Sequence, residues 1–162
     1  MRRADRAFSL VEVIVVVAVC AVVMVLFGSL FVGSWVDYEA TMARVNLQER
    51  MDNFFIVLEE DVLEASDFTI SNNDQRLFLT YPASGFSFSS VSYDFGNGQA
   101  VRTTAGTVTG TQTLIVQGLQ ATSLFLEDAS VPNVVVCQLD LEQQVFGRTV
   151  SLRGLKRLAL RN

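Results

Sequence analysis

The chain has 162 residues, a net charge of −5 at pH 7 and no histidine. The absence of histidine excludes His-based catalytic triads, His metal sites and His acid–base chemistry. The acidic balance gives the surface as a whole no electrostatic reason to bind nucleic acid, and the length suits one compact domain behind a membrane segment.

The chain opens with a short basic segment and continues into a long apolar run. Arg2, Arg3 and Arg6 precede Val13–Val36, a range that contains no Asp, Glu, Lys or Arg. A helix over that range reaches ~36 Å, which is enough to cross a hydrocarbon core of ~30 Å. We therefore predict a membrane-spanning helix, and the arginines on one side of it predict a cytoplasmic amino terminus.

Glu12 stands at the start of this run, where a plain anchor has no need of a charge. An ionised carboxylate inside a membrane costs ~2.5–3.5 kcal/mol unless it finds a partner or lies at the interface. Charge placement alone leaves two interpretations open. Glu12 is either the last interfacial charge before the lipid or a residue with a role of its own.

A helical pattern continues beyond Asp37, because apolar residues recur at three- and four-residue spacing. No Pro or Gly interrupts residues 34–66. We predict one long helix from about Ser9 to about Ala65, apolar all round in its first half and amphipathic in its second. The residues of the second apolar stripe are Tyr38, Met42, Val45, Leu47, Met51, Phe54, Leu58 and Val62.

From Phe68 the pattern changes to short apolar runs with a period of two, separated by turn residues. Short strands joined by tight turns predict antiparallel pairing. The alternation changes phase at Ser89 and Ser90, which predicts a bulge or break there. The tract Thr103–Thr113 favours a hairpin loop, with glycosylation or a partner contact as the alternative. The predicted strands are 68–70, 77–81, 91–95, 100–102, 114–116, 123–126, 134–141 and 149–152.

Opposite charges collect at two places in the second part of the chain. Acids crowd the end of the predicted helix (Glu59, Glu60, Asp61, Glu64 and Asp67), and bases alone follow Glu142 (Arg148, Arg153, Lys156, Arg157 and Arg161). Acids at a helix carboxyl terminus interact unfavourably with the helix dipole. The two sets either meet within the domain, which we favour, or the basic segment faces an acidic partner or DNA.

The sequence Phe-Ser-Leu-Val-Glu at residues 8–12, with its basic leader and Val-rich run, resembles the prepilin signal of the type IV pilin and pseudopilin superfamily. The resemblance implies cleavage by a prepilin peptidase between Ala7 and Phe8, N-methylation of Phe8, and an assembly role for Glu12. Ala7 departs from the family pattern, in which Gly is usual. Residues 58–62, 91–95 and 160–162 look like those of minor pilins and pseudopilins of the J type.

These observations predict an α+β, pilin-like fold in which the long helix packs against an antiparallel β-sheet. The expected parts are a leader (1–7), a transmembrane and assembly helix (8–36) and a soluble domain (37–162). The resemblance implies a structural subunit, not an enzyme, with no cofactor and no metal, at or near the tip of a type II secretion pseudopilus or a type IV pilus.

Its implied partners are other pilin or pseudopilin subunits, the prepilin peptidase and the inner-membrane assembly platform. The implied location is the bacterial inner membrane, with the carboxyl-terminal domain outside the cytoplasm. Two alternatives stay open at this stage. One is a competence-type pseudopilin that contacts DNA, and the other is an unrelated single-pass, membrane-anchored binding protein.

Overall fold

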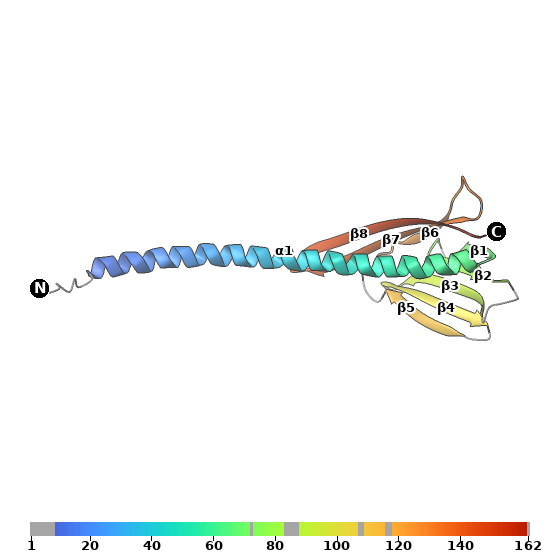
Figure 1. Cartoon of the computed structure of the whole chain (residues 1–162), viewed down its shortest axis with the longest axis horizontal. Coiled ribbons are helices and arrows are strands. Elements are labelled where there is room, and N and C mark those ends of the chain that lie inside the picture. The colour runs from blue at the N-terminus through green and yellow to red at the C-terminus, as the bar shows by residue number, and fades with distance from the viewer. Residues whose placement is uncertain (1–8, 72, 83–87, 107–108, 116–117, 162) are drawn as a thin grey trace, which may run out of the picture. The chain divides into compact units, whose positions relative to one another are not determined.

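The computed structural model describes residues 9–71, 73–82, 88–106, 109–115 and 118–161. It has one long N-terminal helix followed by antiparallel strands, which confirms the predicted α+β, pilin-like layout (Figure 1). The chain forms two compact units, Met1–Glu39 and Ala40–Asn162.

Helix α1 spans Leu10–Glu64, close to the predicted limits. Within its apolar part, the two serine hydroxyls bond to carbonyl oxygens of the preceding turn. Ser29 Oγ donates to the Leu26 oxygen at 2.8 Å, and Ser34 Oγ donates to the Leu30 oxygen at 2.9 Å. Because lipid offers no hydrogen-bond partners, such local bonds let a helix keep serine in an apolar environment.

The second unit buries the later part of the predicted stripe of α1, from Leu47 to Val62. The prediction was wrong for Tyr38, Met42 and Val45, which are exposed, because the periodicity of one helix does not show how far along it the sheets extend. Leu47, Leu58 and Val62 are completely buried, and Phe54 is nearly so. The Phe54 ring packs edge-on against Tyr93 of a facing strand, with 5.9 Å between the ring centroids. Burial of large apolar side chains on both sides of this contact supplies the main stabilising term of the unit.

The first sheet is an antiparallel meander of five consecutive strands, in the order β1-β2-β3-β4-β5. Each hairpin connection joins sequence neighbours, as short strands with tight turns predict. Its strands are β1 (Asp67–Ser71), β2 (Arg76–Thr80), β3 (Phe88–Gly96), β4 (Gln99–Gly106) and β5 (Gly110–Ile115).

The second sheet has the order β6-β7-β8, so the strands divide into two sheets rather than one. Its strands are β6 (Leu124–Glu127), β7 (Val134–Val145) and β8 (Arg148–Ala159). The aromatic rings of Phe95 and Phe125 stack with 4.4 Å between their centroids and join the two sheets. Alternation marks a strand but does not say which neighbour it pairs with, so the sequence could not reveal this division.

Two local predictions in the first sheet have a clear outcome. The register between β3 and β4 shifts between Phe88 and Ser90, which confirms the predicted irregularity. The Thr- and Gly-rich tract does form a hairpin, but its loop is shorter than expected. Thr103 pairs with Thr111 and Thr104 with Gly110, because Thr is a good strand former even where it buries nothing.

Gly118 lies where only glycine fits. Its φ is +89°, and a Cβ atom there would come within 2.5 Å of the Glu142 carbonyl oxygen. The Gly118 oxygen in turn accepts a hydrogen bond from the Glu142 N–H at 2.7 Å. This close approach fixes the segment before β6 against β7.

We expect Gly118→Ala to lower the free energy of unfolding by ~1–3 kcal/mol, because it combines an unfavourable φ with a backbone collision. Gly96→Ala is the matched control, since the nearest atom to its Cβ would be 4.0 Å away. Thermal melting of the purified full chain measures both variants. Equal melting temperatures for the two would contradict the packing described for Gly118.

Candidate functional site

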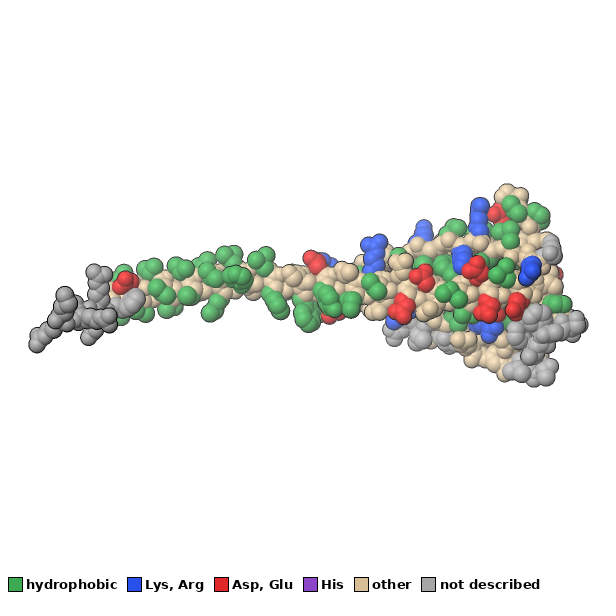
Figure 2. All heavy atoms as spheres, in the orientation of Figure 1, with side chains coloured by type: hydrophobic (Ala, Val, Ile, Leu, Met, Phe, Trp, Pro, Cys, Tyr) green, Lys and Arg blue, Asp and Glu red, His purple; other side chains and the backbone are tan. Residues whose placement is uncertain are grey.

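The described residues of the first unit form an apolar helix surface that is exposed. α1 is the one helix in the described part of the chain that is long and apolar enough to cross a membrane. Its large hydrophobic side chains from Leu10 to Trp35 are exposed, and Figure 2 shows them along the visible face. A surface of this kind requires an apolar environment.

Glu12 lies in the first turn of α1, where it has a partner in its own helix. Its Oε2 accepts a hydrogen bond from the Ser9 N–H at 3.4 Å, and the Val13 N–H donates to the Ser9 oxygen at 3.2 Å. A carboxylate here also interacts favourably with the helix dipole. Ser9 and Glu12 have the spacing of a capping box, a signal that the sequence contains and that our prediction did not use.

The predicted processing residues Ala7 and Phe8 lie outside the described residues. Glu12 accepts a neutral N–H, and this bond leaves room for further donors, because a carboxylate has about four acceptor positions.

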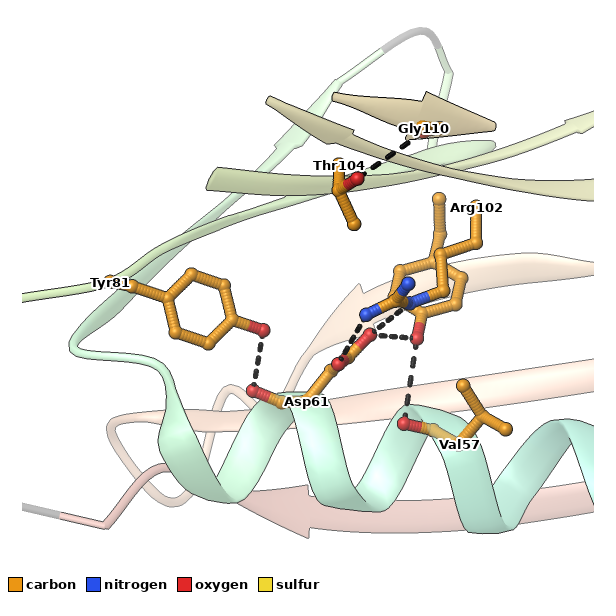
Figure 3. Close-up of polar contacts among 7 residues, drawn as sticks. Val57, Asp61, Tyr81, Arg102, Thr104 and Gly110 are labelled. Carbon is orange, nitrogen blue, oxygen red and sulfur yellow. Dashed lines mark hydrogen bonds and ion pairs between the residues drawn. The ribbon is translucent and has the colours of Figure 1, made fainter. Parts of the chain in front are cut away.

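A buried polar cluster near the end of α1 was not predicted from the sequence (Figure 3). Asp61 on α1 accepts two hydrogen bonds from the Arg102 guanidinium on β4. Nε donates to Oδ2 at 2.7 Å, and Nη2 donates to Oδ1 at 2.9 Å. Tyr93 of β3 also donates its hydroxyl to Oδ2, and Tyr81 donates its hydroxyl to the Asp61 carbonyl oxygen at 2.9 Å. These partners lie far apart in sequence, so no spacing rule could find them.

Tyr81, Tyr93 and Arg102 keep their protons at neutral pH, because the pKa of each is raised. Burial, followed by the nearby Asp61 charge, raises the pKa of both Tyr81 and Tyr93 well above the ordinary value. The hydrogen bond to Asp61 raises the pKa of the Arg102 guanidinium, so this base stays charged. Groups that do not titrate near neutral pH are poor proton donors and acceptors in catalysis. The role of the cluster is structural: its hydrogen bonds join Asp61 of α1 to Tyr93 and Arg102 of the first sheet.

We expect Arg102→Leu to lower the free energy of unfolding by ~3–5 kcal/mol, because it leaves the Asp61 carboxylate buried without its cation. The side chains of Arg102 and Asp61 are 17% and 7% exposed. Arg76→Leu is the control, since it breaks the Arg76–Asp94 pair, whose side chains are 49% and 32% exposed, and should cost only ~0–1 kcal/mol. Thermal melting of the two full-length variants makes the comparison, and similar losses would argue against a special role for Asp61.

The basic segment at the carboxyl terminus meets acids of the same domain, which is the reading we favoured. The nitrogen–oxygen distances are 2.5 Å for Arg153–Asp140, 2.6 Å for Lys156–Glu59 and 3.5 Å for Arg157–Asp128. The predicted contact with the acidic helix end holds for Lys156. Arg153 and Arg157 instead pair with acids on β7 and just after β6, because β8 runs beside β7 along its whole length.

In the Arg153–Asp140 pair the carboxylate is buried, whereas the arginine side chain is 69% exposed. Burial of Asp140 raises its pKa, but hydrogen bonds from Arg153 and from its polar neighbours more than offset this, and the pKa of the carboxyl is lowered. Among the described residues, no group of three or more His, Cys, Asp or Glu side chains is arranged to hold a metal ion.

Comparison with known proteins supports the reading of the amino terminus. Residues 2–28 match the family model described as the prokaryotic N-terminal methylation motif. The search of curated proteins and the search of solved structures each gave no significant match. The matched motif, followed by a long helix packed on antiparallel sheets, agrees with the resemblance to the type IV pilin and pseudopilin superfamily. The motif and the apolar helix also indicate single-pass anchoring in a membrane.

Proposed function

We propose that this chain is a minor pilin or pseudopilin, a structural subunit that assembles at or near the tip of a type II secretion pseudopilus or a type IV pilus. The proposal is carried by the methylation motif at residues 2–28, which leads into a helix with exposed apolar side chains. Such a helix is covered by lipid before assembly and by the helices of neighbouring subunits after it. This role needs no catalytic group, cofactor or metal.

The proposed parts follow the sequence. A prepilin peptidase removes the leader 1–7 by cutting between Ala7 and Phe8, and Phe8 is then N-methylated. Residues 8–36 anchor the subunit in the bacterial inner membrane and later assemble, while 37–162 form the domain outside the cytoplasm. Removal of the leader takes three Arg and one Asp from the chain and shifts its net charge from −5 to −7.

The proposed partners are other pilin or pseudopilin subunits and the assembly platform. The tip position rests on the resemblance of residues 58–62, 91–95 and 160–162 to J-type subunits. Contact with DNA is less well supported, because Arg153, Lys156 and Arg157 already have acidic partners. An unrelated single-pass binding protein would have no use for the methylation motif.

We expect mass spectrometry of the mature protein to find an N-methylated Phe8 at its amino terminus. Ala7→Leu should block leader removal, since a bulky residue crowds the peptidase site, and should leave a larger, unassembled membrane protein. Ala7→Gly is the matched control and should be processed at least as well as the unaltered chain. A mature Ala7→Leu protein of unchanged mass would place the cleavage site elsewhere.

We expect Glu12→Val to insert into the membrane normally but to enter filaments poorly. In lipid, an unmatched amino group on a neighbouring subunit is costly, and Glu12 would neutralise it and set the axial register. By insertion scales, a charge without a partner at the centre of the bilayer costs ~2.5–3.5 kcal/mol. Immunodetection of the variant in sheared filaments, against its amount in membranes, measures incorporation.

Glu12→Gln separates this role from helix capping, because the amide oxygen can still accept the Ser9 N–H. If charge sets the register, the Gln variant fails as the Val variant does. If only the cap matters, the Gln variant assembles normally, and that result would overturn the register role of Glu12.

A further inference from the structure

The hairpin between β7 and β8 has an aromatic residue at its tip in an unfavourable backbone conformation. Val145 pairs with Arg148, so the turn consists of Phe146 and Gly147, with φ of 47° and 75°. Two-residue turns of this kind favour Asn-Gly, and a bulky side chain with positive φ is a clear outlier. The Phe146 side chain is nevertheless 67% exposed, so it gains little from packing within the chain.

The turn between β3 and β4 in the first sheet has a similar backbone without a bulky residue at positive φ. Asn97 and Gly98 join β3 to β4 with φ of 52° and 74°, and Gly96 pairs with Gln99. The two turns have nearly the same backbone, but one carries the favoured Asn and the other an exposed Phe. A strained, exposed aromatic residue points to a role outside the fold.

The course of β8 along α1 locates this tip within the second unit. A Cβ on Gly154 would meet Met51 and Phe55, and Lys156 reaches Glu59, so the two elements run in the same direction. From Gly154 back to Phe146 the strand covers ~26 Å at ~3.3 Å per residue. The same distance along a helix takes ~17 residues. The strand is therefore long enough for the tip to reach the start of the helical segment of this unit, which begins at Ala40.

This end of the second unit is also the end that follows the membrane anchor in the chain. The uncharged run ends at Val36, and Ala40 lies one helical turn beyond it. Chain connectivity therefore leaves only about one helical turn between the apolar run and the start of the helical segment of this unit. Aromatic side chains are enriched at this level of a membrane, where the acyl chains meet the headgroups.

We propose that the Phe146 tip is a second membrane contact, in which the ring enters the interfacial layer of the bilayer beside the anchor. The inference rests on the proposed membrane-anchored function. A lipid surface suits the tip better than a protein partner does, because one exposed ring, with polar Gln144 and Arg148 two residues away on either side, is far smaller than a specific protein interface. With two points of attachment to the membrane, the domain keeps a fixed distance from the bilayer before assembly.

Tryptophan fluorescence of the full chain in phosphatidylcholine vesicles tests the proposal. Trp35 is the single tryptophan, so Trp35→Phe with Phe146→Trp puts the only fluorophore at the tip. We expect its emission to be blue-shifted, quenched when the acyl chains carry bromine, and protected from acrylamide in the water. The double variant Trp35→Phe with Phe78→Trp is the matched control, since Phe78 is an exposed β2 residue, and it should show the opposite behaviour.

Fluorescence of the unaltered chain distinguishes a failure of the proposed membrane anchoring from a failure of the proposed tip contact. Trp35 closes the apolar run, so bromolipid must quench it if the anchor is in the membrane. If Trp35 is not quenched, the proposed anchoring fails. If Trp35 is quenched while the tip is open to acrylamide and insensitive to bromolipid, the tip contact alone is overturned. A tip fluorophore shielded from both quenchers would mean burial against protein and would also overturn it.

Discussion

One continuous helix has to satisfy two different environments, and the rest of the structure follows from this constraint. The first part of α1 exposes apolar side chains on all sides, whereas the second part buries a single stripe that includes Leu47 and Leu58. Lipid can cover the first part, but the second needs a protein surface. The strands supply it, because β3 brings Tyr93 against Phe54 while β8 passes Met51 at Gly154.

The polar cluster around Asp61 gives this packing its register. Apolar contacts are non-directional, so a helix lying on two sheets could slide or turn with little penalty. The bidentate bond from Arg102 to Asp61, with the hydroxyls of Tyr81 and Tyr93, permits only one position. The buried Asp61 carboxylate is tolerated because Arg102 and Tyr93, both from the first sheet, supply hydrogen bonds to its two oxygens.

The sequence allowed the local elements to be predicted because their signals are local. The apolar run and the helical period gave α1, and the change of phase at Ser89 and Ser90 predicted the irregularity found in β3. The division into two sheets and the Asp61–Arg102 pair depend on contacts between distant residues, for which one sequence carries no signal. The basic segment was predictable in part. The meeting of opposite charges could be predicted, but the acids opposite Arg153 and Arg157 depend on the pairing of β7 with β8.

The position of β8 has a consequence for how the domain folds. It follows the other described strands in sequence, yet it lies directly on α1, which precedes them all, and its Lys156 bonds to Glu59 across 97 residues of sequence. The hairpins of the first sheet need only neighbouring residues and can form early, whereas this closure is non-local and therefore slow. Until it forms, part of the apolar stripe of α1 lies open to solvent. The newly made protein thus exposes an apolar surface until β8 has packed against α1, and this packing is the event that protects the surface from aggregation.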